Sequence, residues 1–353
     1  MAVLVTGGAG YIGSHMVWEL LDRGEDVVVI DRLSTGFAWA VPAEARLHVG
    51  DIADRDLLRT VFSLHPIDAV IHFAGSVVVP ESVADPLGYY ANNTCASRLL
   101  LEETVRAGVG HFVFSSTAAI YGAVGDAPVG EDHAAVPVTP YGASKLMIER
   151  MLADVAAAHA FSYVALRYFN VSGADPKGRT GQSTPGATHL LKVACETALG
   201  KRPYMEVFGD DYATADGTGE RDFIHVSDLV AAHGLALDHL RSGAPSLTAN
   251  CGYGRGFSVR QLIGAVKRAT GRDFEVRVAP RRPGDLARVI ADPARIRAVL
   301  GWEPRHDDLD HIVSTAVDWE RSLSTRNTPT MIETPDPGHY PPLIRRTAPR
   351  RVR

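Results

Sequence analysis

The sequence has little of what marks a disulfide-linked domain, a thiolate metal site or a membrane protein. Its 353 residues include only Cys95, Cys195 and Cys251, and this odd, scattered set predicts neither a disulfide framework nor a metal site. No apolar run reaches the roughly 18 residues that a membrane span needs. The first apolar segment starts at Ala2 and meets glycine at Gly7, which leaves no room for a signal peptide. We therefore expect a cytoplasmic protein with reduced thiols, without a metal and without a membrane anchor.

A basic excess is also missing. The 36 lysines and arginines stand against 41 aspartates and glutamates, which gives a net charge of -5 and a pI near 6.3. A general nucleic-acid binder usually carries a basic face, so this balance excludes that class. The hydrophobic content of 46% and the charged content of 22% are ordinary for a globular protein. The length suffices for roughly two domains of about 150 residues each.

Short apolar runs alternate with amphipathic segments in the first half of the chain. The runs read as buried strands and span residues 2–7, 26–31, 46–51, 69–74, 111–116 and 163–169. Helical periodicity lies between most of them, for example over 14–24 and 84–108. Nearly continuous β-branched runs that alternate with helices are typical of a parallel sheet covered on both faces. Residues 1–172 are thus predicted to form a doubly wound α/β domain of the Rossmann type.

The second half is less regular and predicts a smaller α/β domain over 173–325. Its helical patterns lie at 188–200, 227–241, 259–270 and 308–322, between loops rich in glycine and proline. The apolar run at 247–251 could return to the first sheet, so a return to the first domain is expected within 222–251. Residues 326–353 are rich in proline and arginine, lack periodicity and read as a tail.

A glycine-rich turn follows the first strand and opens a helix. Its glycines, Gly7, Gly10 and Gly13, let the turn tighten, let the backbone approach a pyrophosphate and let the helix pack on the strand. The helix N-terminus adds free amides and a positive dipole for that pyrophosphate. A glycine-rich turn by itself often marks only a turn. Here the strand–turn–helix context favours a dinucleotide site.

Acidic residues end the next two strands. Asp31 lies eighteen residues after Gly13, where a carboxylate suits the ribose hydroxyls of NAD and repels the 2′-phosphate of NADP. Arg32 beside it could hold such a phosphate and is a weak counter-argument. Asp51 and Ile52 end the third strand, where an adenine could lie, although a simple strand-end acid explains Asp51 equally well. NAD is the predicted cofactor.

A tyrosine and a lysine stand four residues apart in the string TPYGASK, residues 139–145. Tyr141 and Lys145 would lie on one face of a helix, because positions i and i+4 are neighbours there. Two solvated surface side chains are the simpler interpretation of these seven residues alone. The other interpretation is a phenol whose acidity is tuned by the ammonium near it.

Together, the glycine turn and the Tyr-x-x-x-Lys pair resemble the extended, sugar-nucleotide-modifying branch of the short-chain dehydrogenase/reductase superfamily. Within that branch the chain is similar to the UDP-hexose 4-epimerases over about residues 1–325. The matching strings are VLVTGGAGYIGSH, DAVIHFAG, ESVADPLGYYANN, FSSTAAIYG, TPYGASKLMIE, LRYFNVSGA, DDYATADGTGERDFIHVSDL and APRRPGDL. The string that begins DDYAT is the most specific, because it is much longer than a generic cofactor motif.

The resemblance implies an isomerase that interconverts UDP-galactose and UDP-glucose through a 4-keto intermediate, with retained NAD as hydride shuttle. Tyr141 would take the proton from the sugar O4, Thr117 would orient or relay it, and Lys145 would favour the phenolate. A phenol has a reference pKa of about 10, so a pKa near 7 needs about 4 kcal/mol of charge stabilisation. An ammonium in a dry pocket, together with the positive nicotinamide, can supply that.

The resemblance also implies binding residues and a role in galactose and nucleotide-sugar metabolism. The implied cofactor-binding residues are Gly7, Gly10, Tyr11, Ile12, Gly13, Asp31, Asp51, Ile52, Phe73, Ala74, Gly75, Asn92, Ser115, Tyr141, Lys145 and Tyr168. The implied substrate-binding residues are Asn93, Thr117, Asn170, His189, Phe208, Arg221, Arg282 and Asp285. The two arginines would clamp the diphosphate, Phe208 would stack on uracil and Asp285 would bind a ribose hydroxyl. Taken alone, each of these four is more often a surface charge or a core aromatic.

A homodimer is implied as well, built from the helices after Ala84 and around 141–152, although their apolar residues could simply pack on their own sheet. Three positions depart from the family pattern. Val77 replaces a cofactor-binding lysine, which predicts looser NAD retention, and His189 replaces an asparagine. Val289 replaces a bulky tyrosine of some members and could admit an N-acetyl group at the sugar C2.

Four other functions are weighed against this one. A 4,6-dehydratase would carry an Asp-Glu pair after Thr117, where this chain has Ala118 and Ala119. A uronate epimerase fits the string DGTGERDFIHV poorly. A net dehydrogenase, which releases NADH at each turnover, is excluded only by the resemblance. A non-catalytic NAD-binding regulator would tend to lose Tyr141 or Lys145, and both are present.

Overall fold

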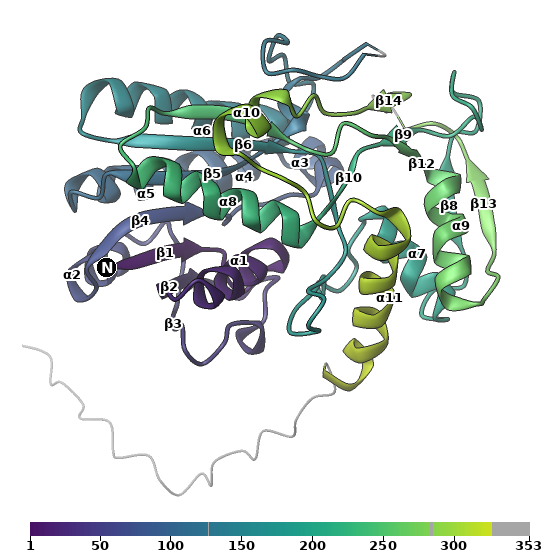
Figure 1. The fold of residues 1–353 in the computed structure, drawn as a ribbon, viewed down its shortest axis with the longest axis horizontal. Coiled ribbons are helices and arrows are strands. Elements are labelled where there is room, and N and C mark those ends of the chain that lie inside the picture. The colour runs from purple at the N-terminus through teal and green to yellow at the C-terminus, as the bar shows by residue number, and fades with distance from the viewer. Residues whose placement is uncertain (126, 283–284, 327–353) are drawn as a thin grey trace, which may run out of the picture.

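The computed structural model describes residues 1–125, 127–282 and 285–326, and its centre is a seven-stranded sheet (Figure 1). The strand order is β11-β6-β5-β4-β1-β2-β3, and each neighbouring pair is parallel. The strands are β1 (Ala2–Thr6), β2 (Asp26–Asp31), β3 (Arg46–Val49), β4 (Ile67–His72), β5 (His111–Thr117), β6 (Ser162–Tyr168) and β11 (Leu247–Cys251). The order reverses between β1 and β4, which is the switch point where such sheets bind ligands. The predicted Rossmann-type sheet is confirmed.

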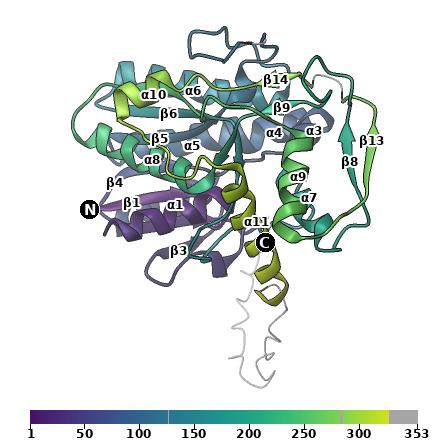
Figure 2. The same cartoon turned by 45° about the vertical axis from the view of Figure 1, so that its right-hand side comes forward.

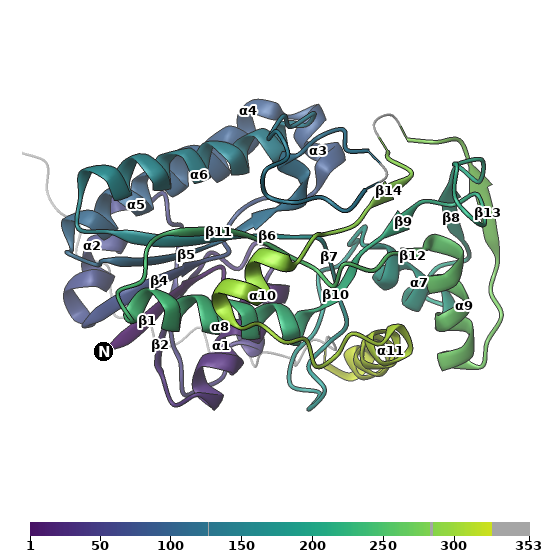
Figure 3. The same ribbon diagram turned by 45° about the horizontal axis from the view of Figure 1, so that its top comes forward.

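Helices cover both faces of this sheet (Figure 3). One face carries α2 (Arg55–Leu64), α5 (Ala96–Arg106) and α6 (Pro140–Ala158), and the other carries α1 (Tyr11–Asp22) and α8 (Val226–Arg241). Alternate residues of β1 serve the two layers, since Leu4 packs in one hydrophobic cluster and Val3 and Val5 in the other. All three are fully buried. Burial on both faces explains why the strands read as continuous apolar runs.

The remaining elements gather mainly beyond the carboxyl ends of the sheet strands (Figure 2). The short strands are β7 (Asn170–Ser172), β8 (Met205–Phe208), β9 (Glu220–Arg221), β10 (Phe223–His225), β12 (Phe257–Ser258), β13 (Val276–Ala279) and β14 (Arg288–Val289). The helices are α7 (Leu190–Ala198), α9 (Val259–Thr270), α10 (Ala294–Leu300) and α11 (Leu309–Arg326). The helices α7, α9 and α11 pack on one another. We call this group of elements the second lobe; the predicted domain boundaries stay a prediction.

The segment predicted as one helix over 84–108 is broken into several pieces. It contains the end of α3 (Val79–Ala84), then α4 (Pro86–Tyr89), a π-helical turn η2 (Tyr90–Cys95) and α5. Asp85 causes the first break, because its carboxylate accepts the Gly88 amide at 3.0 Å and caps α4. Short 3₁₀ turns, η1 (Ala38–Ala40) and η3 (Ala118–Ile120), complete the elements.

Two further expectations concern the ends of the chain and the membrane. The predicted tail falls on residues 327–353, which lie outside the described part, apart from Arg326 at the end of α11. Within the described residues, no helix combines the length and the apolar character that crossing a membrane requires.

Candidate active site

The glycine-rich turn between β1 and α1 is tightly packed where the backbone must bend. Gly7 has a φ of +73°, and a Cβ there would lie 2.7 Å from the Ala74 nitrogen. A Cβ on Gly13 would lie 2.1 Å from the Gly7 oxygen, so α1 could not approach β1 with any larger residue. Gly10 is the N-cap of α1 and has no side-chain cap, which leaves amides of the first turn free. The turn therefore fits a pyrophosphate.

A cavity of about 430 Å³ opens in front of this turn. It is lined by the predicted cofactor residues Gly7, Gly10, Tyr11, Ile12, Gly13, Asp31, Asp51, Ile52, Phe73, Ala74, Gly75, Asn92, Tyr141 and Tyr168. The predicted substrate residues Thr117, Asn170 and His189 line the same cavity. A single space thus connects the glycine turn, the two strand-end acids and the tyrosine of α6.

Hydrogen bonds fix the two carboxylates, Asp31 and Asp51, that line one end of the cavity. Asp31 accepts the amides of Ala9 at 2.9 Å and of Leu33 at 2.8 Å, and Leu33 adopts a left-handed φ of 58°. Arg32 Nη1 donates to Asp51 Oδ2 at 3.2 Å and to the side-chain oxygen Oδ1 of Asn92 at 2.9 Å. The guanidinium is therefore engaged with an acid and an amide of the site. This arrangement places two carboxylates, and no unengaged arginine, at the strand ends.

The tyrosine and lysine of α6 are both buried, which excludes the interpretation as two surface side chains. Tyr141 is 6% exposed and Lys145 is 2% exposed. Thr139 caps α6 by accepting the Gly142 amide at 3.2 Å, and Pro140 is its first residue. Lys145 lies behind the cavity wall, where its Nζ donates to the Ser115 carbonyl at 3.1 Å.

Burial dominates the acidity of this pair. It lowers the pKa of Lys145 to about 8, because the charged amine is removed from water. Burial raises the pKa of the Tyr141 phenol, and Tyr168 raises it further, whereas the Thr117 hydroxyl lowers it. Burial thus disfavours the phenolate form of Tyr141.

Asn93 has a different place from the one expected of a substrate ligand. It lies in the π-helical turn η2 and is 1% exposed. Its side-chain oxygen Oδ1 accepts the Ser76 backbone amide at 2.7 Å. Its Nδ2 donates to the Ser76 backbone carbonyl and to Ser144 Oγ, both at 3.0 Å. Asn93 thus ties the loop after β4 to α6, beside the cavity. No spacing in the sequence links Ser76 to Ser144, so this clamp was not predictable.

Four predicted substrate residues form a separate group in the second lobe, outside the lining of the cavity. Arg282 stacks over Phe208, with 3.6 Å between the guanidinium carbon and the ring centroid. Arg221 donates to the Glu220 carbonyl at 2.9 Å, and burial lowers its pKa while Asp285 raises it. The Asp285 amide donates to the Arg282 carbonyl at 3.1 Å. The structure thus brings the four together, with the two arginines as their positive charges.

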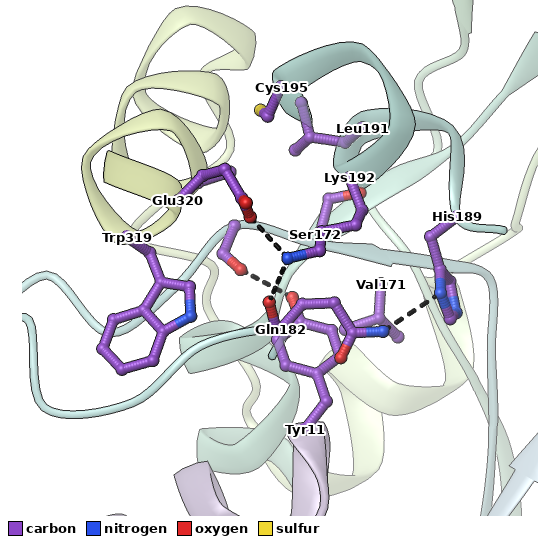
Figure 4. Close-up of a pocket in the computed structure, with 12 residues that line it drawn as sticks. Tyr11, Val171, Ser172, Gln182, His189, Leu191, Lys192, Cys195, Trp319 and Glu320 are labelled. Atoms are coloured by element: carbon purple, nitrogen blue, oxygen red, sulfur yellow. Dashed lines mark hydrogen bonds and ion pairs between the residues drawn. The ribbon is translucent and has the colours of Figure 1, made fainter. Parts of the chain in front are cut away.

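A small pocket of about 20 Å³ adjoins the main cavity (Figure 4). Gln182 and His189 line both spaces, and the Gln182 amide pairs with His189 Nδ1 at 3.2 Å. The pKa of His189 is lowered because the surrounding protein partly removes the charged ring from water, although the residue keeps an exposed surface. Lys192 donates to the Gln182 carbonyl at 3.1 Å and pairs with Glu320 on α11. Gln182 was missed in the sequence, because no motif marks it.

Comparison with known proteins identifies the family. The model of the NAD dependent epimerase/dehydratase family matches residues 3–252, which is most of the chain. The chain belongs to this family. Its cofactor is therefore NAD, and the glycine turn, the open first turn of α1 and the adjoining cavity fit that dinucleotide.

Relatives of this epimerase/dehydratase family member cover nearly its whole length. A UDP-glucose 4-epimerase of Azospirillum brasilense is 57% identical over 91% of this chain and 92% of that protein. One of Halalkalibacterium halodurans is 46% identical over 91% of this chain and 96% of that protein. A solved UDP-glucose 4-epimerase from Brucella ovis in complex with NAD is 44% identical, with a TM-score of 0.88 over 90% of this chain and 97% of its own.

A second solved relative carries an N-acetylated sugar as well as glucose in its name. The UDP-Glc/GlcNAc 4-epimerase from Campylobacter jejuni is 44% identical, with a TM-score of 0.80, and covers 91% of this chain and 99% of its own. Within the described residues of our epimerase/dehydratase family member, no group of three or more histidine, cysteine or acidic side chains could hold a metal ion.

Proposed function

We propose that this protein is a UDP-glucose 4-epimerase, which interconverts UDP-galactose and UDP-glucose with NAD retained between turnovers. One observation carries the proposal: Tyr141 and Thr117 line the same cavity as the glycine turn, with Lys145 buried directly behind them. A proton acceptor thus shares one space with the NAD site. Relatives at up to 57% identity are UDP-glucose 4-epimerases, which supports the same reaction.

Tyr141 takes the proton of the sugar O4 as the C4–H bond breaks, and returns it when the 4-keto group is reduced from its other face. Thr117 holds the hydroxyl or relays its proton. Lys145 supplies fixed positive charge that favours the phenolate, offsetting the penalty of burial. Held at the turn of Gly7, Gly10 and Gly13, NAD would supply the hydride acceptor and donor for the sugar C4. No net oxidation results, because the hydride and the proton both return to the sugar.

The nucleotide part of the substrate would be held by the group in the second lobe. Arg221 and Arg282 supply planar, always-charged guanidinium groups for the diphosphate. Phe208 offers a ring face for uracil, and Asp285 an acceptor for a ribose hydroxyl. Arg282 covers one face of the Phe208 ring, which leaves the other face for the base unless the guanidinium moves. Asn170 and His189 would hold the sugar between the two groups.

A homodimer and a cytoplasmic location complete the proposal. Val83 on α3, Leu87 on α4 and Met147 on α6 are exposed by 63%, 78% and 45%. These helices contact one another, so the exposed side chains lie on neighbouring elements. An apolar surface of this kind fits a second copy of the chain. Light scattering behind a sizing column measures the mass, and a monomer at micromolar concentration would contradict the dimer.

The three free cysteines agree with a reducing compartment.

The first experiment follows UDP-galactose by NMR with purified protein and no added cofactor. Appearance of UDP-glucose anomeric signals, up to a stable mixture, would establish 4-epimerisation with NAD carried by the protein. The matched control is Tyr141→Phe, which keeps the ring and removes the proton acceptor, and is expected to lose activity by at least about 100-fold. Absence of conversion by the unmodified protein, even after NAD is supplied, would refute the proposed function.

A further inference from the structure

A buried ion pair begins one helical turn beyond Lys145. Glu149 follows Tyr141 and Lys145 at the same four-residue spacing on α6. The three side chains therefore share one face of the helix, and all are buried. The Glu149 carboxylate binds the guanidinium of Arg167 on β6 through Nη2–Oε2 at 2.6 Å and Nε–Oε1 at 3.0 Å. A fork of this kind fixes direction as well as distance.

The same carboxylate also reaches β5. Ser116 Oγ donates to Glu149 Oε1 at 2.5 Å. Ser116 lies between two residues of the candidate site: the carbonyl of Ser115 binds Lys145 Nζ, and Thr117 lines the cavity. Glu149 therefore contacts β5 at Ser116, the residue between Ser115, which binds Lys145, and Thr117, which lines the cavity with Tyr141.

The partner arginine extends the connection to the sheet and its edge. Arg167 immediately precedes Tyr168, which lines the cavity. Arg167 Nη1 donates to the Tyr121 hydroxyl at 2.9 Å, and that hydroxyl donates to Asn250 on β11 at 2.6 Å. The network centred on Glu149 and Arg167 thus joins α6 to β5, β6 and β11.

Stability alone does not account for such a pair. Removing two charges from water costs nearly as much as their attraction returns, and apolar replacements of similar volume are often as stable. The best-attested use of buried ionic groups is to select one arrangement among several. Here the arrangement selected is the position of α6 along β5 and β6.

We propose that Glu149 and Arg167 are positioning residues that set α6 against β5, so that Tyr141 and Lys145 face Thr117 and the cofactor correctly. Neither side chain lines the cavity, and so each acts through the residues it holds. A displacement of about 1 Å at a reacting group can cost about 100-fold in rate. The turnover readout of this inference rests on the proposed 4-epimerase function.

The test replaces both charges at once, as Glu149→Leu with Arg167→Met, which leaves no unpaired buried charge. We expect a folded protein whose kcat for UDP-galactose falls about 10- to 100-fold while KM changes less than about threefold. The dissociation constant of NAD, measured by calorimetry, is expected to rise at least about fivefold, because Lys145 is displaced. The matched control is Glu103→Leu, since Glu103 is a fully buried carboxylate on α5 that binds three arginines away from the cavity. That control is expected to keep kcat, KM and NAD affinity.

A folded double variant with unchanged kcat and unchanged NAD affinity would overturn the inference. Should the unmodified protein fail to turn over UDP-galactose, the proposed function falls, and NAD affinity alone decides the positioning role. Should the double variant not fold, Ser116→Ala decides, since it removes one bond and no charge. We expect Ser116→Ala to lower kcat about fivefold, in line with the loss of one hydrogen bond; unchanged kcat and NAD affinity would count against the inference.

Discussion

Replacing Lys145 by methionine is expected to stabilise the dinucleotide-free protein while it abolishes turnover. The amine is 2% exposed, and its nearest polar partner is the Ser115 carbonyl at 3.1 Å. The Phe114 ring lies 4.9 Å away on its other side. No carboxylate is paired with this lysine among the ion pairs of the described residues. The charged form is therefore held in place without a counter-ion.

The size of the effect follows from the pKa. Burial lowers the pKa of Lys145 from 10.5 to about 8, and a difference of this size corresponds to about 3 kcal/mol between the charged and neutral forms. Methionine has a similar length and carries no charge, so it removes this cost. It also forfeits the hydrogen bond to Ser115, which is worth about 1 kcal/mol. The net expectation at pH 7 is a gain of about 1 to 2 kcal/mol in the free energy of unfolding.

The pH dependence distinguishes this cause from a simple packing effect. The folded-state pKa of Lys145 lies below the unfolded value, so the destabilising contribution is fully present below about pH 8. As the pH rises from about 8 to 10.5, the folded protein loses this proton before the unfolded chain does. The wild-type protein should therefore gain stability relative to Lys145→Met over that window.

Urea unfolding of both proteins at pH 7 and at pH 10, after removal of NAD, measures the difference. Addition of NAD is then expected to stabilise the wild type more than Lys145→Met, because the lysine is a proposed NAD ligand. A variant that is less stable than the wild type at pH 7, or a difference that does not change with pH, would refute the reasoning from burial.

Three further predictions test other parts of the site. Gly13→Ala places a Cβ 2.1 Å from the Gly7 oxygen. We expect it to lower the free energy of unfolding in urea by at least about 2 kcal/mol and to abolish NAD binding. The control is Gly264→Ala on α9, where the nearest atom is a flexible arginine tip at 3.6 Å, and we expect its stability to be unchanged or higher. Val77 is 46% exposed at the cavity and supplies no charge to the cofactor, so NAD should be lost on gel filtration and Val77→Lys should slow that loss; full occupancy after extended dialysis would contradict this. Val289→Tyr is expected to reduce turnover of UDP-N-acetylglucosamine more than that of UDP-galactose, and undetectable turnover of the N-acetylated sugar by the unmodified protein would exclude the idea of extra room.

Local patterns in the sequence predicted the central sheet and the two ends of the cavity. The apolar runs of β1, β2, β4, β5 and β6 are continuous because both faces are buried, and this signal needs no knowledge of distant residues. The glycines of the first turn and the four-residue spacing of Tyr141 and Lys145 are likewise local. A one-turn spacing on a helix fixes a shared face wherever the helix packs.

The parts that could not be predicted depend on contacts between distant segments. Asn93 resembles a ligand in sequence, yet it clamps Ser76 to Ser144, which lies 51 residues further along the chain. The π-helical turn that aims it has no composition signal of its own. Arg282 could be predicted as a phosphate ligand, but its position over Phe208 depends on how two loops meet.

Two buried charges on one face of α6 have opposite energetic character, and the contrast indicates what each does. Lys145 is buried without a carboxylate, and its lowered pKa shows that the fold holds it at a cost. Perturbed buried charges of this kind cluster at functional sites, and in the proposed mechanism this charge favours the phenolate of Tyr141. One turn further, the charge of Glu149 is compensated by Arg167, and both carboxylate oxygens accept hydrogen bonds from Arg167 or Ser116. In the proposed mechanism the uncompensated charge therefore acts on the reaction, and in the proposed positioning role the compensated pair holds the helix that carries it.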